Sequence, residues 1–234
     1  MRKLMILFLF FCFACLSNEA YNVYNWRDSG RVTSDVPTIF IFDYSNSMNE
    51  RINGVSKYRH LLNSFGMILG KIPETVPVGV RIYGHRWGIT NADACRASIL
   101  VEGLSNYNRN NIVDAISKYR ARGMTPITYS LKQTIEKDFP KGDYKKHIVL
   151  VTDGGENCDG SPCEYAIELV KQRKDIKIDV IAINVGNEED IDQLACTANV
   201  TGGKIYEVET SAELLRSLED SVAGEKEVNA QILR

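Results

Sequence analysis

Two short segments that are apolar at every position constrain the fold of this chain more than any other feature. Residues 39–42 read IFIF and residues 148–151 read IVLV. A half-exposed strand alternates apolar and polar residues, whereas a strand covered on both faces is apolar throughout. The two segments therefore predict central strands of a sheet that has helices packed on each side.

The rest of the chain alternates strand-length apolar segments with longer amphipathic ones. This rhythm predicts a doubly wound α/β fold, in which a mostly parallel sheet carries helices on both faces. Ligands of such sheets bind beyond the carboxyl ends of the strands, where the chain connections reverse direction, so functional residues are expected there. The expected strands are residues 38–42, 78–83, 98–101, 147–151, 178–183 and 204–208, and the expected helices are residues 58–69, 112–119, 127–136, 164–173, 188–199 and 212–222.

The length and the local composition indicate one domain between two terminal segments. A chain of 234 residues suits one well-filled core better than two. We expect a signal peptide over residues 1–15, and then a polar tether over residues 16–35 that is rich in Asn, Ser, Asp and Tyr. The domain is expected over residues 36–223 and a short tail over residues 224–234.

The N-terminal segment has the pattern of a secretory signal peptide. Two basic residues precede an apolar run over residues 4–16, which is shorter than the roughly 20 residues of a membrane-spanning helix. Residues 13–15 resemble the end of a lipobox and predict a lipid on Cys15, although Cys12 stands where such motifs usually carry Leu. Ordinary cleavage near Ala20 is the alternative. We expect export to the cell envelope, in the periplasm or at the outer surface, with or without a lipid anchor.

Four cysteines lie beyond the leader: Cys95, Cys158, Cys163 and Cys196. An even number in an exported chain predicts two disulfides. Of the three arrangements we favour Cys163 with Cys196, because helices after consecutive strands lie side by side, and Cys95 with Cys158, because both fall near the carboxyl edge of the sheet. Zinc is the alternative, but the spacing lacks the paired C-x-x-C of zinc sites.

The charge balance argues against a nucleic acid partner. The chain has 28 basic and 30 acidic residues, which gives a formal net charge of −2. Nucleic acid binding proteins usually carry a basic surface that neutralises phosphates. No such excess of positive charge is present, so we expect no DNA or RNA ligand.

Oxygen-bearing side chains recur at three of the predicted strand ends and helix starts. Asp43, Ser45 and Ser47 follow the first strand, Thr125 opens a helix, and Asp153 follows the strand that ends at residue 151. Magnesium binds about six oxygen ligands and usually keeps several waters, so hydroxyls together with carboxylates suit it. The set predicts a Mg²⁺ site, with Mn²⁺ or Ca²⁺ as alternatives.

This order of residues, D-x-S-x-S, then T, then D, resembles the metal-ion-dependent adhesion site (MIDAS) of the von Willebrand factor type A (VWA) family. The resemblance extends from about residue 37 to residue 222, and the cysteines make it similar to a bacterial, cysteine-containing branch. Tyr44 and Asn46 replace the smaller residues that many members have between the metal-binding side chains. Three further segments carry the resemblance: residues 81–86 (RIYGHR), 152–158 (TDGGENC) and 201–203 (TGG).

The resemblance also implies a role for each residue of the set. Ser45 and Ser47 are implied to bind the ion directly, and Thr125 to bind it when a ligand is engaged. Asp43 and Asp153 are implied to act largely through bound water. The function implied is an exported, non-enzymatic binding module, in which an acidic side chain of a partner protein completes the coordination shell of the cation.

Three other interpretations compete with this one. Asp43, Ser45 and Ser47 could cap the turn and helix that follow them, as Asp and Ser often do. A structural envelope protein could use the metal only to stabilise its fold. A Mg²⁺-dependent phosphatase of the haloacid dehalogenase type also has an Asp after its first strand, but it needs a carboxylate two residues later, where Ser45 stands. None of the three histidines has a serine or cysteine partner in a recognisable catalytic motif, so we expect no enzyme.

Overall fold

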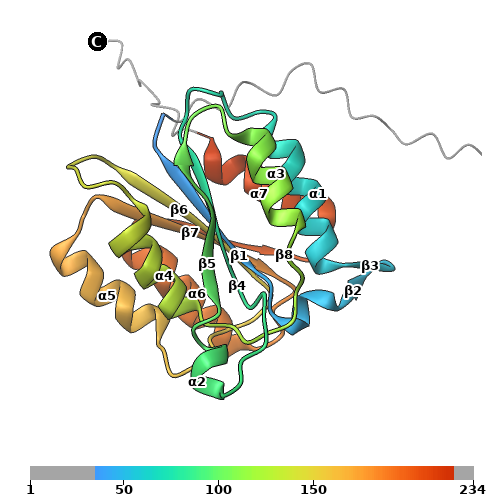
Figure 1. Ribbon diagram of the computed structural model, residues 1–234. Helices are drawn as coiled ribbons and strands as arrows, with labels where there is room; N and C mark the ends of the chain where they lie inside the picture. Colours follow the sequence, from blue (N-terminus) through green and yellow to red (C-terminus); the bar gives the residue numbers. More distant parts are fainter. Residues whose placement is uncertain (1–34, 224–234) are drawn as a thin grey trace, which may run out of the picture. The chain divides into compact units, whose positions relative to one another are not determined.

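The two fully apolar segments form neighbouring strands at the middle of a six-stranded sheet in the computed structural model (Figure 1). The sheet order is β5-β4-β1-β6-β7-β8, in which β4 and β5 are antiparallel and the other neighbouring pairs are parallel. The predicted doubly wound, mostly parallel sheet is therefore confirmed. The strands are β1 (Thr38–Asp43), β4 (Val78–Tyr83), β5 (Ser98–Ser105), β6 (Lys146–Thr152), β7 (Ile176–Ile183) and β8 (Ile205–Val208).

The structure describes residues 35–223. The predicted signal peptide with Cys15, the tether up to residue 34 and the tail over residues 224–234 lie outside these residues. Within residues 35–223, no helix is both long and apolar enough to cross a membrane. Asp35 and Ala223 line one pocket at the edge of the sheet where β6 and β7 begin.

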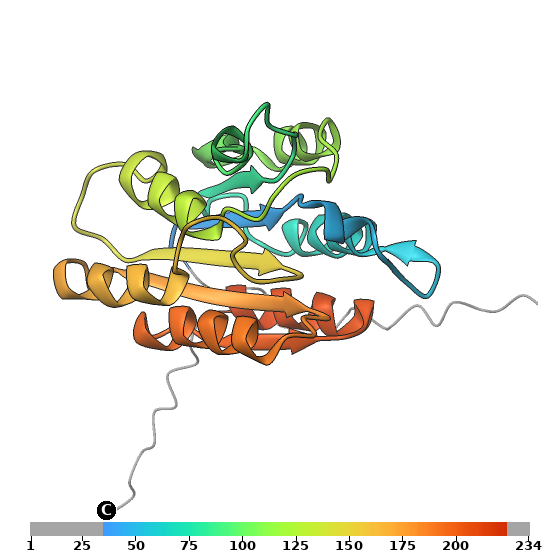
Figure 2. The ribbon, with the colours of Figure 1, turned by 90° about the horizontal axis from the view of Figure 1, so that it is seen from below.

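The helices form one layer on each face of the sheet (Figures 1 and 2). One layer contains α1, α3 and α7, and the other contains α4, α5 and α6. A π-helical turn over Thr134–Asp138 continues α4. The helices are α1 (Lys57–Leu69), α3 (Arg109–Ser117), α4 (Ile127–Gln133), α5 (Pro162–Gln172), α6 (Glu188–Val200) and α7 (Ser211–Val222).

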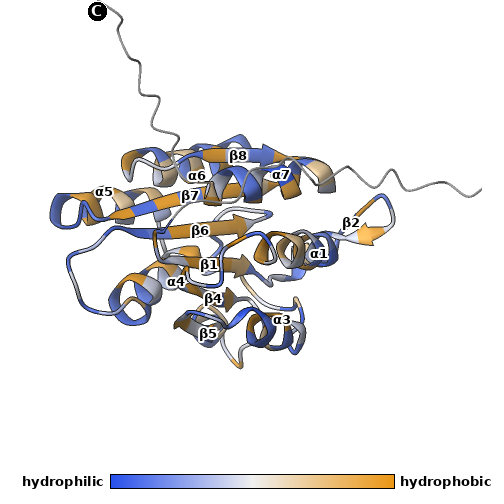
Figure 3. Ribbon diagram, turned by 90° about the horizontal axis from the view of Figure 1, so that it is seen from above, coloured by the Kyte–Doolittle hydropathy of each residue, from blue (hydrophilic) through white to orange (hydrophobic). Residues whose placement is uncertain are grey.

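The central strand β1 explains why both faces of the sheet must be apolar. Phe40 and Phe42 pack edge-on against Phe65 of α1, with ring centroids 4.7 and 4.6 Å apart, whereas Ile39 and Ile41 belong to the core on the opposite face. Burial of each such side chain contributes about 1.5 to 3 kcal/mol. Figure 3 shows the result, since the strands are largely hydrophobic while the helices mix hydrophobic and hydrophilic residues.

Polar side chains fix where the helices begin. Ser56 and Ser161 accept hydrogen bonds from backbone N–H groups in the first turns of α1 and α5. Thr210 and Glu213 form a reciprocal capping box at the start of α7. Such caps stabilise a helix by about 1 kcal/mol each, because they satisfy N–H groups that have no partner within the helix.

Short elements between the predicted ones escaped the sequence analysis, because they are polar and too brief to show a period. The turn of a small hairpin contains Asn53 and Gly54, both with positive φ (52° and 85°), and Asn-Gly is the pair that such hairpin turns favour. That pair could have revealed the hairpin. The elements are the 3₁₀ turn η1 (Asn46–Asn49), the hairpin strands β2 (Arg51–Ile52) and β3 (Val55–Ser56), and the short helix α2 (Asn91–Ala94).

Both predicted disulfides are present with the favoured pairing. Cys163 and Cys196 join α5 to α6, with their Cα atoms 5.3 Å apart. Cys95 and Cys158 join the end of α2 to the loop after β6, with their Cα atoms 5.7 Å apart. The second bond lies near the carboxyl edge of the sheet and therefore connects two loops that border the predicted metal site.

Candidate metal centre

The candidate centre lies at the carboxyl ends of β1 and β6. The connection after β1 leads to α1 on one face of the sheet, and the connection after β6 leads to α5 on the other face. The loops of these adjacent strands therefore diverge, which leaves the crevice where doubly wound sheets bind ligands. Asp43 is the last residue of β1, and Asp153 directly follows β6.

A chain of hydrogen bonds brings three of the predicted side chains together. The Oγ atoms of Ser45 and Ser47 lie 2.9 Å apart, and the hydroxyl of Ser47 donates to Oδ1 of Asp153 at 2.7 Å. Ser45 precedes η1, but its side chain makes no capping hydrogen bond to that turn. The capping interpretation therefore fails for Ser45, whose hydroxyl points toward the other oxygen ligands instead.

Asp43 corrects one expectation from the sequence, which placed it after the first strand. It belongs to β1 and is fully buried. Its Oδ1 accepts the backbone N–H of Ser45 at 2.6 Å, and its Oδ2 accepts the hydroxyl of Thr152 at 2.8 Å. Burial, followed by the charge of Asp153, raises the pKa of Asp43 to about 6. Asp43 thus holds the backbone of the loop that carries the two serines.

Backbone hydrogen bonds place Thr125 at the centre, and its side chain takes no part in the chain of hydrogen bonds from Ser45 to Asp153 described above. Gly123 forms a parallel bridge with Ser45, and its carbonyl accepts the N–H of Asn46 at 3.0 Å. Oδ1 of Asn157, in the loop after β6, accepts the N–H of Thr125 at 2.6 Å. The structure therefore holds Thr125 between the loop after β1 and the loop after β6.

Gly84 makes this close approach of the loops achievable. It has φ +70°, and a Cβ at this position would lie 2.6 Å from the N atom of Ser45 and 2.7 Å from the carbonyl oxygen of Met124. Only glycine is free of that clash, and glycine adopts positive φ without strain. The glycine in residues 81–86 is therefore required for the assembly of the centre.

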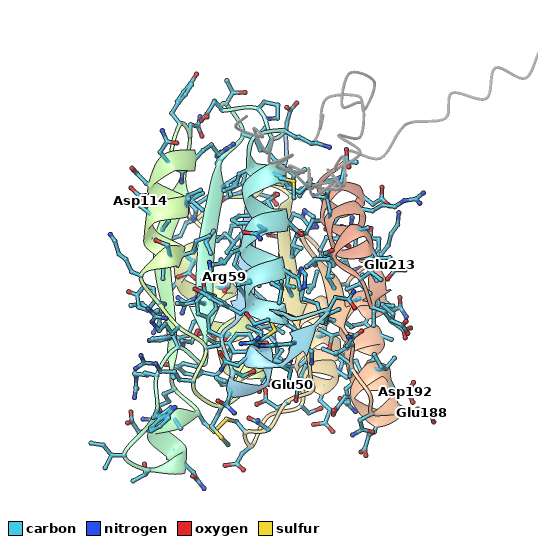
Figure 4. All side chains as sticks on the ribbon, turned by 90° about the vertical axis from the view of Figure 1, so that its right-hand side faces the viewer. Glu50, Arg59, Asp114, Glu188, Asp192 and Glu213 are labelled. Atoms are coloured by element: carbon cyan, nitrogen blue, oxygen red, sulfur yellow. A yellow bond between two sulfur atoms is a disulfide. The ribbon has the colours of Figure 1, made fainter. Side chains whose placement is uncertain are left out.

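Sequence reasoning missed a buried lysine in the centre. Nζ of Lys57, the first residue of α1, lies 2.9 Å from Oδ2 of Asp153 and 2.7 Å from Oε2 of Glu50. Burial lowers the pKa of Lys57, but the hydrogen bonds with Glu50 and Asp153 outweigh it and hold that pKa above its ordinary value. Figure 4 shows Glu50 at the end of the molecule where α1 begins. A single lysine at a helix start has no pattern that would single it out in the sequence.

The loop after β6 is also tied to the start of α4. Oε2 of Glu156 accepts the N–H of Thr128 at 2.7 Å, and its Oε1 accepts the N–H of Cys158 at 3.0 Å. Glu156 and Asn157 thus tie the loop to Thr125 and to the first turn of α4. The disulfide at Cys158 fixes the same loop from the other end.

The donor atoms fit a hard divalent cation. The serine hydroxyls and the two aspartates are all oxygen donors, which suit Mg²⁺, whereas zinc usually binds Cys or His. Within residues 35–223, no three His, Cys, Asp or Glu side chains converge to form a metal site. A cation in this centre therefore depends on the hydroxyls of Ser45 and Ser47.

Comparison with known families agrees with this arrangement. A model of the von Willebrand factor type A domain matches residues 38–221. The chain belongs to this family. The VWA domain is similar to two proteins of Bacillus subtilis (strain 168). It is 29% identical over 179 residues to "Uncharacterized protein YwmC", covering 74% of this chain and 77% of that protein, and 28% identical over 187 residues to "Uncharacterized protein YwmD", covering 77% and 81%.

Solved structures share the fold of the VWA domain. Proximal thread matrix protein 1 from the mussel byssus, solved "with zinc occupied MIDAS motif", has a TM-score of 0.61 and 23% identity, covering 80% of this chain and 44% of that chain. The von Willebrand factor type A structure from Catenulispora acidiphila has a TM-score of 0.64 and 16% identity, covering 81% and 42%. This chain spans less than half of either structure, and the similarity establishes the fold.

Proposed function

We propose that this VWA domain is an exported, non-enzymatic binding module that holds a divalent cation and, through it, an acidic side chain of a partner protein. The observation that carries the proposal is the chain of hydrogen bonds from Ser45 through Ser47 to Asp153. It brings neutral hydroxyls and a carboxylate together at the edge of the sheet. The two disulfides agree with maturation outside the reducing cytoplasm.

The proposed role of each residue follows from which of its atoms already form hydrogen bonds. Ser45 and Ser47 hold the ion directly. Both oxygens of Asp43 already accept hydrogen bonds, so Asp43 acts by orienting Ser45 and bound water. Thr125 joins when the partner engages. Because the serine hydroxyls are neutral, part of the positive charge of the bound ion stays uncompensated. A carboxylate of the partner balances that charge.

Mg²⁺ is the cation we favour. The zinc-containing site of the mussel protein, which has the same fold, is a reason to test zinc beside Mg²⁺, Mn²⁺ and Ca²⁺. Calorimetry should give binding of at least one of these ions to the wild type, and Ser47→Ala should weaken it at least about tenfold. Ser117→Ala, which removes an exposed hydroxyl on α3, is the matched control and should bind as the wild type does.

The rival in which the metal only stabilises the fold makes a different prediction. Lys57 already places a positive charge against Asp153, so the loops have a counter-charge of their own. We therefore expect partner capture from envelope extract to be abolished by EDTA while the far-UV circular dichroism of the domain is unchanged. Capture that survives EDTA, together with a lower unfolding temperature in EDTA, would support the rival.

A further inference from the structure

Two large apolar side chains project into solvent beside the candidate metal centre. Trp87 is 74% exposed and Ile89 is 98% exposed. Both lie in the loop between β4 and α2, and α2 lies at the edge of the sheet where the strands end (Figure 1). We propose that Trp87 and Ile89 form an apolar contact surface for the partner segment whose acidic side chain binds the cation. This inference rests on the proposed function and names the chemistry of its partner.

The loop that carries this contact surface is rigidly built. The guanidinium of Arg86 donates to both carboxylate oxygens of Asp93, at 2.7 and 3.0 Å, and Oδ2 of Asp93 also accepts the N–H of Ile89 at 3.0 Å. Gly88 packs so closely against Ala94 that a Cβ there would overlap its backbone. These contacts fix the backbone and leave the two apolar side chains outside, so their exposure is a property of an ordered loop.

The contact surface is connected to the candidate centre through Gly84. The carbonyl of Gly84 accepts the N–H of Arg122 at 3.1 Å and the N–H of Gly123 at 2.7 Å, and Gly84 itself packs against Ser45. Trp87 follows Gly84 by three residues, so its Cα lies within about 10 Å of Gly84. One extended segment of a partner could therefore touch both, with its acidic and apolar residues roughly three to five positions apart.

Two exposed arginines close to the centre favour an acidic segment. Arg120 and Arg122, in the segment between α3 and Thr125, are exposed, and within residues 35–223 neither forms an ion pair. Positive charge at the rim speeds the approach of an acidic partner. Aromatic side chains that become buried at the centre of an interface contribute a large share of the binding energy. An acidic segment with one aromatic or aliphatic residue satisfies both features.

The test uses a phage-displayed random peptide library on the immobilised full-length chain. Phage are bound in Mg²⁺ and eluted with EDTA. Peptides selected by the wild type should combine Asp or Glu with an apolar residue at a fixed spacing. Synthetic copies should bind the Trp87→Ser, Ile89→Ser double variant at least about tenfold more weakly, while its affinity for Mg²⁺ by calorimetry is unchanged. Trp87→Ser alone should show part of the loss.

A matched control replaces two exposed apolar residues on the helices, Met67 and Val113, with serine and should bind the peptides as the wild type does. Selected peptides that have the acid without an apolar residue, or that bind the double variant equally well, would overturn the contact surface but leave the metal site intact. Absence of any EDTA-eluted peptide would overturn the proposed function itself. If the wild type sediments as a dimer and the double variant as a monomer, the surface serves self-association. That result would overturn the proposal of a peptide partner.

Discussion

At the scale of single residues, Asp43 does more than the sequence indicated, because it is a buried acceptor for two donors rather than a loop residue. Removing its carboxylate leaves the N–H of Ser45 buried without a partner, at about 1 to 3 kcal/mol, whereas the hydroxyl of Thr152 keeps the carbonyl of Gly154 as an acceptor. Asp43→Ala should therefore lower the free energy of unfolding by about 1 to 3 kcal/mol in addition to abolishing cation binding. Urea unfolding and calorimetry measure the two effects separately.

Asp43→Asn provides the sharper comparison. The amide keeps the size of the side chain and one acceptor oxygen but removes the charge, so its loss of stability should be smaller while cation binding is still lost. If folded Asp43→Asn binds Mg²⁺ as tightly as the wild type, the centre does not hold a cation in the way proposed.

Lys57 leads to a second prediction at this scale. Its ammonium lies against the same carboxylate that faces the candidate ion and therefore repels a cation placed there. Charges a few ångströms apart interact by more than about 1.4 kcal/mol at partly buried sites, so Lys57→Met should bind Mg²⁺ at least about tenfold more tightly. Without metal, Lys57→Met should also have a lower free energy of unfolding than the wild type. Lys71→Met, which removes a lysine paired with Glu219, controls for loss of a lysine, and weaker binding by Lys57→Met would contradict the prediction.

At the scale of elements, the loop after β6 carries Asp153, Glu156 and Asn157 and is anchored at Cys158. Replacing Cys95 and Cys158 with serine should free this loop, which positions Thr125, and weaken cation binding. Replacing Cys163 and Cys196 should leave cation binding unchanged, because that bond joins two helices to each other rather than the loops that hold Thr125. Loss of either disulfide should lower the free energy of unfolding by roughly 2 to 4 kcal/mol. Calorimetry separates the two variants, and equal losses of affinity would show that the loop needs no anchor.

The elements that could be predicted from the sequence are those whose pattern is set by burial. β1 and β6 are apolar because both faces are covered, and the helices are amphipathic because one face is covered. α2 and the hairpin over residues 51–56 were missed because each is short and its geometry depends on particular turn residues. The candidate ligand residues could be proposed from side-chain type and order, but the burial of Asp43 and the ion pair of Lys57 could not, because both depend on which loops meet.

At the scale of the whole molecule, stability depends on pH through ion pairs far from the centre. The hydrogen bonds from Arg173 and Lys146 hold the pKa of Asp175 well below its ordinary value. A carboxyl with a lowered folded pKa stabilises the fold above its unfolded pKa, about 3.9, and this contribution disappears as the pH falls further. Asp175→Asn should therefore be less stable than the wild type at pH 7, and the difference should shrink below about pH 4.

Acid unfolding of the two proteins, followed by circular dichroism, measures this. Asp143→Asn, an exposed aspartate in the neighbouring loop, is the control and should follow the wild-type curve. A difference between Asp175→Asn and the wild type that stays constant from pH 7 to pH 2 would assign the effect to packing rather than to charge.

The position of β1 also has a mechanical consequence. The described part of the chain enters close to the start of β1, and the candidate centre lies at its far end. Tension between an anchor before residue 35 and a ligand held at Ser45 would therefore act along β1, parallel to its neighbours β4 and β6. The hydrogen bonds to both strands cross this direction and resist the pull together as shear rather than opening one after another. Under the proposed function, a ligand held at the end of this fully buried central strand would therefore pull along the direction in which the domain resists unfolding.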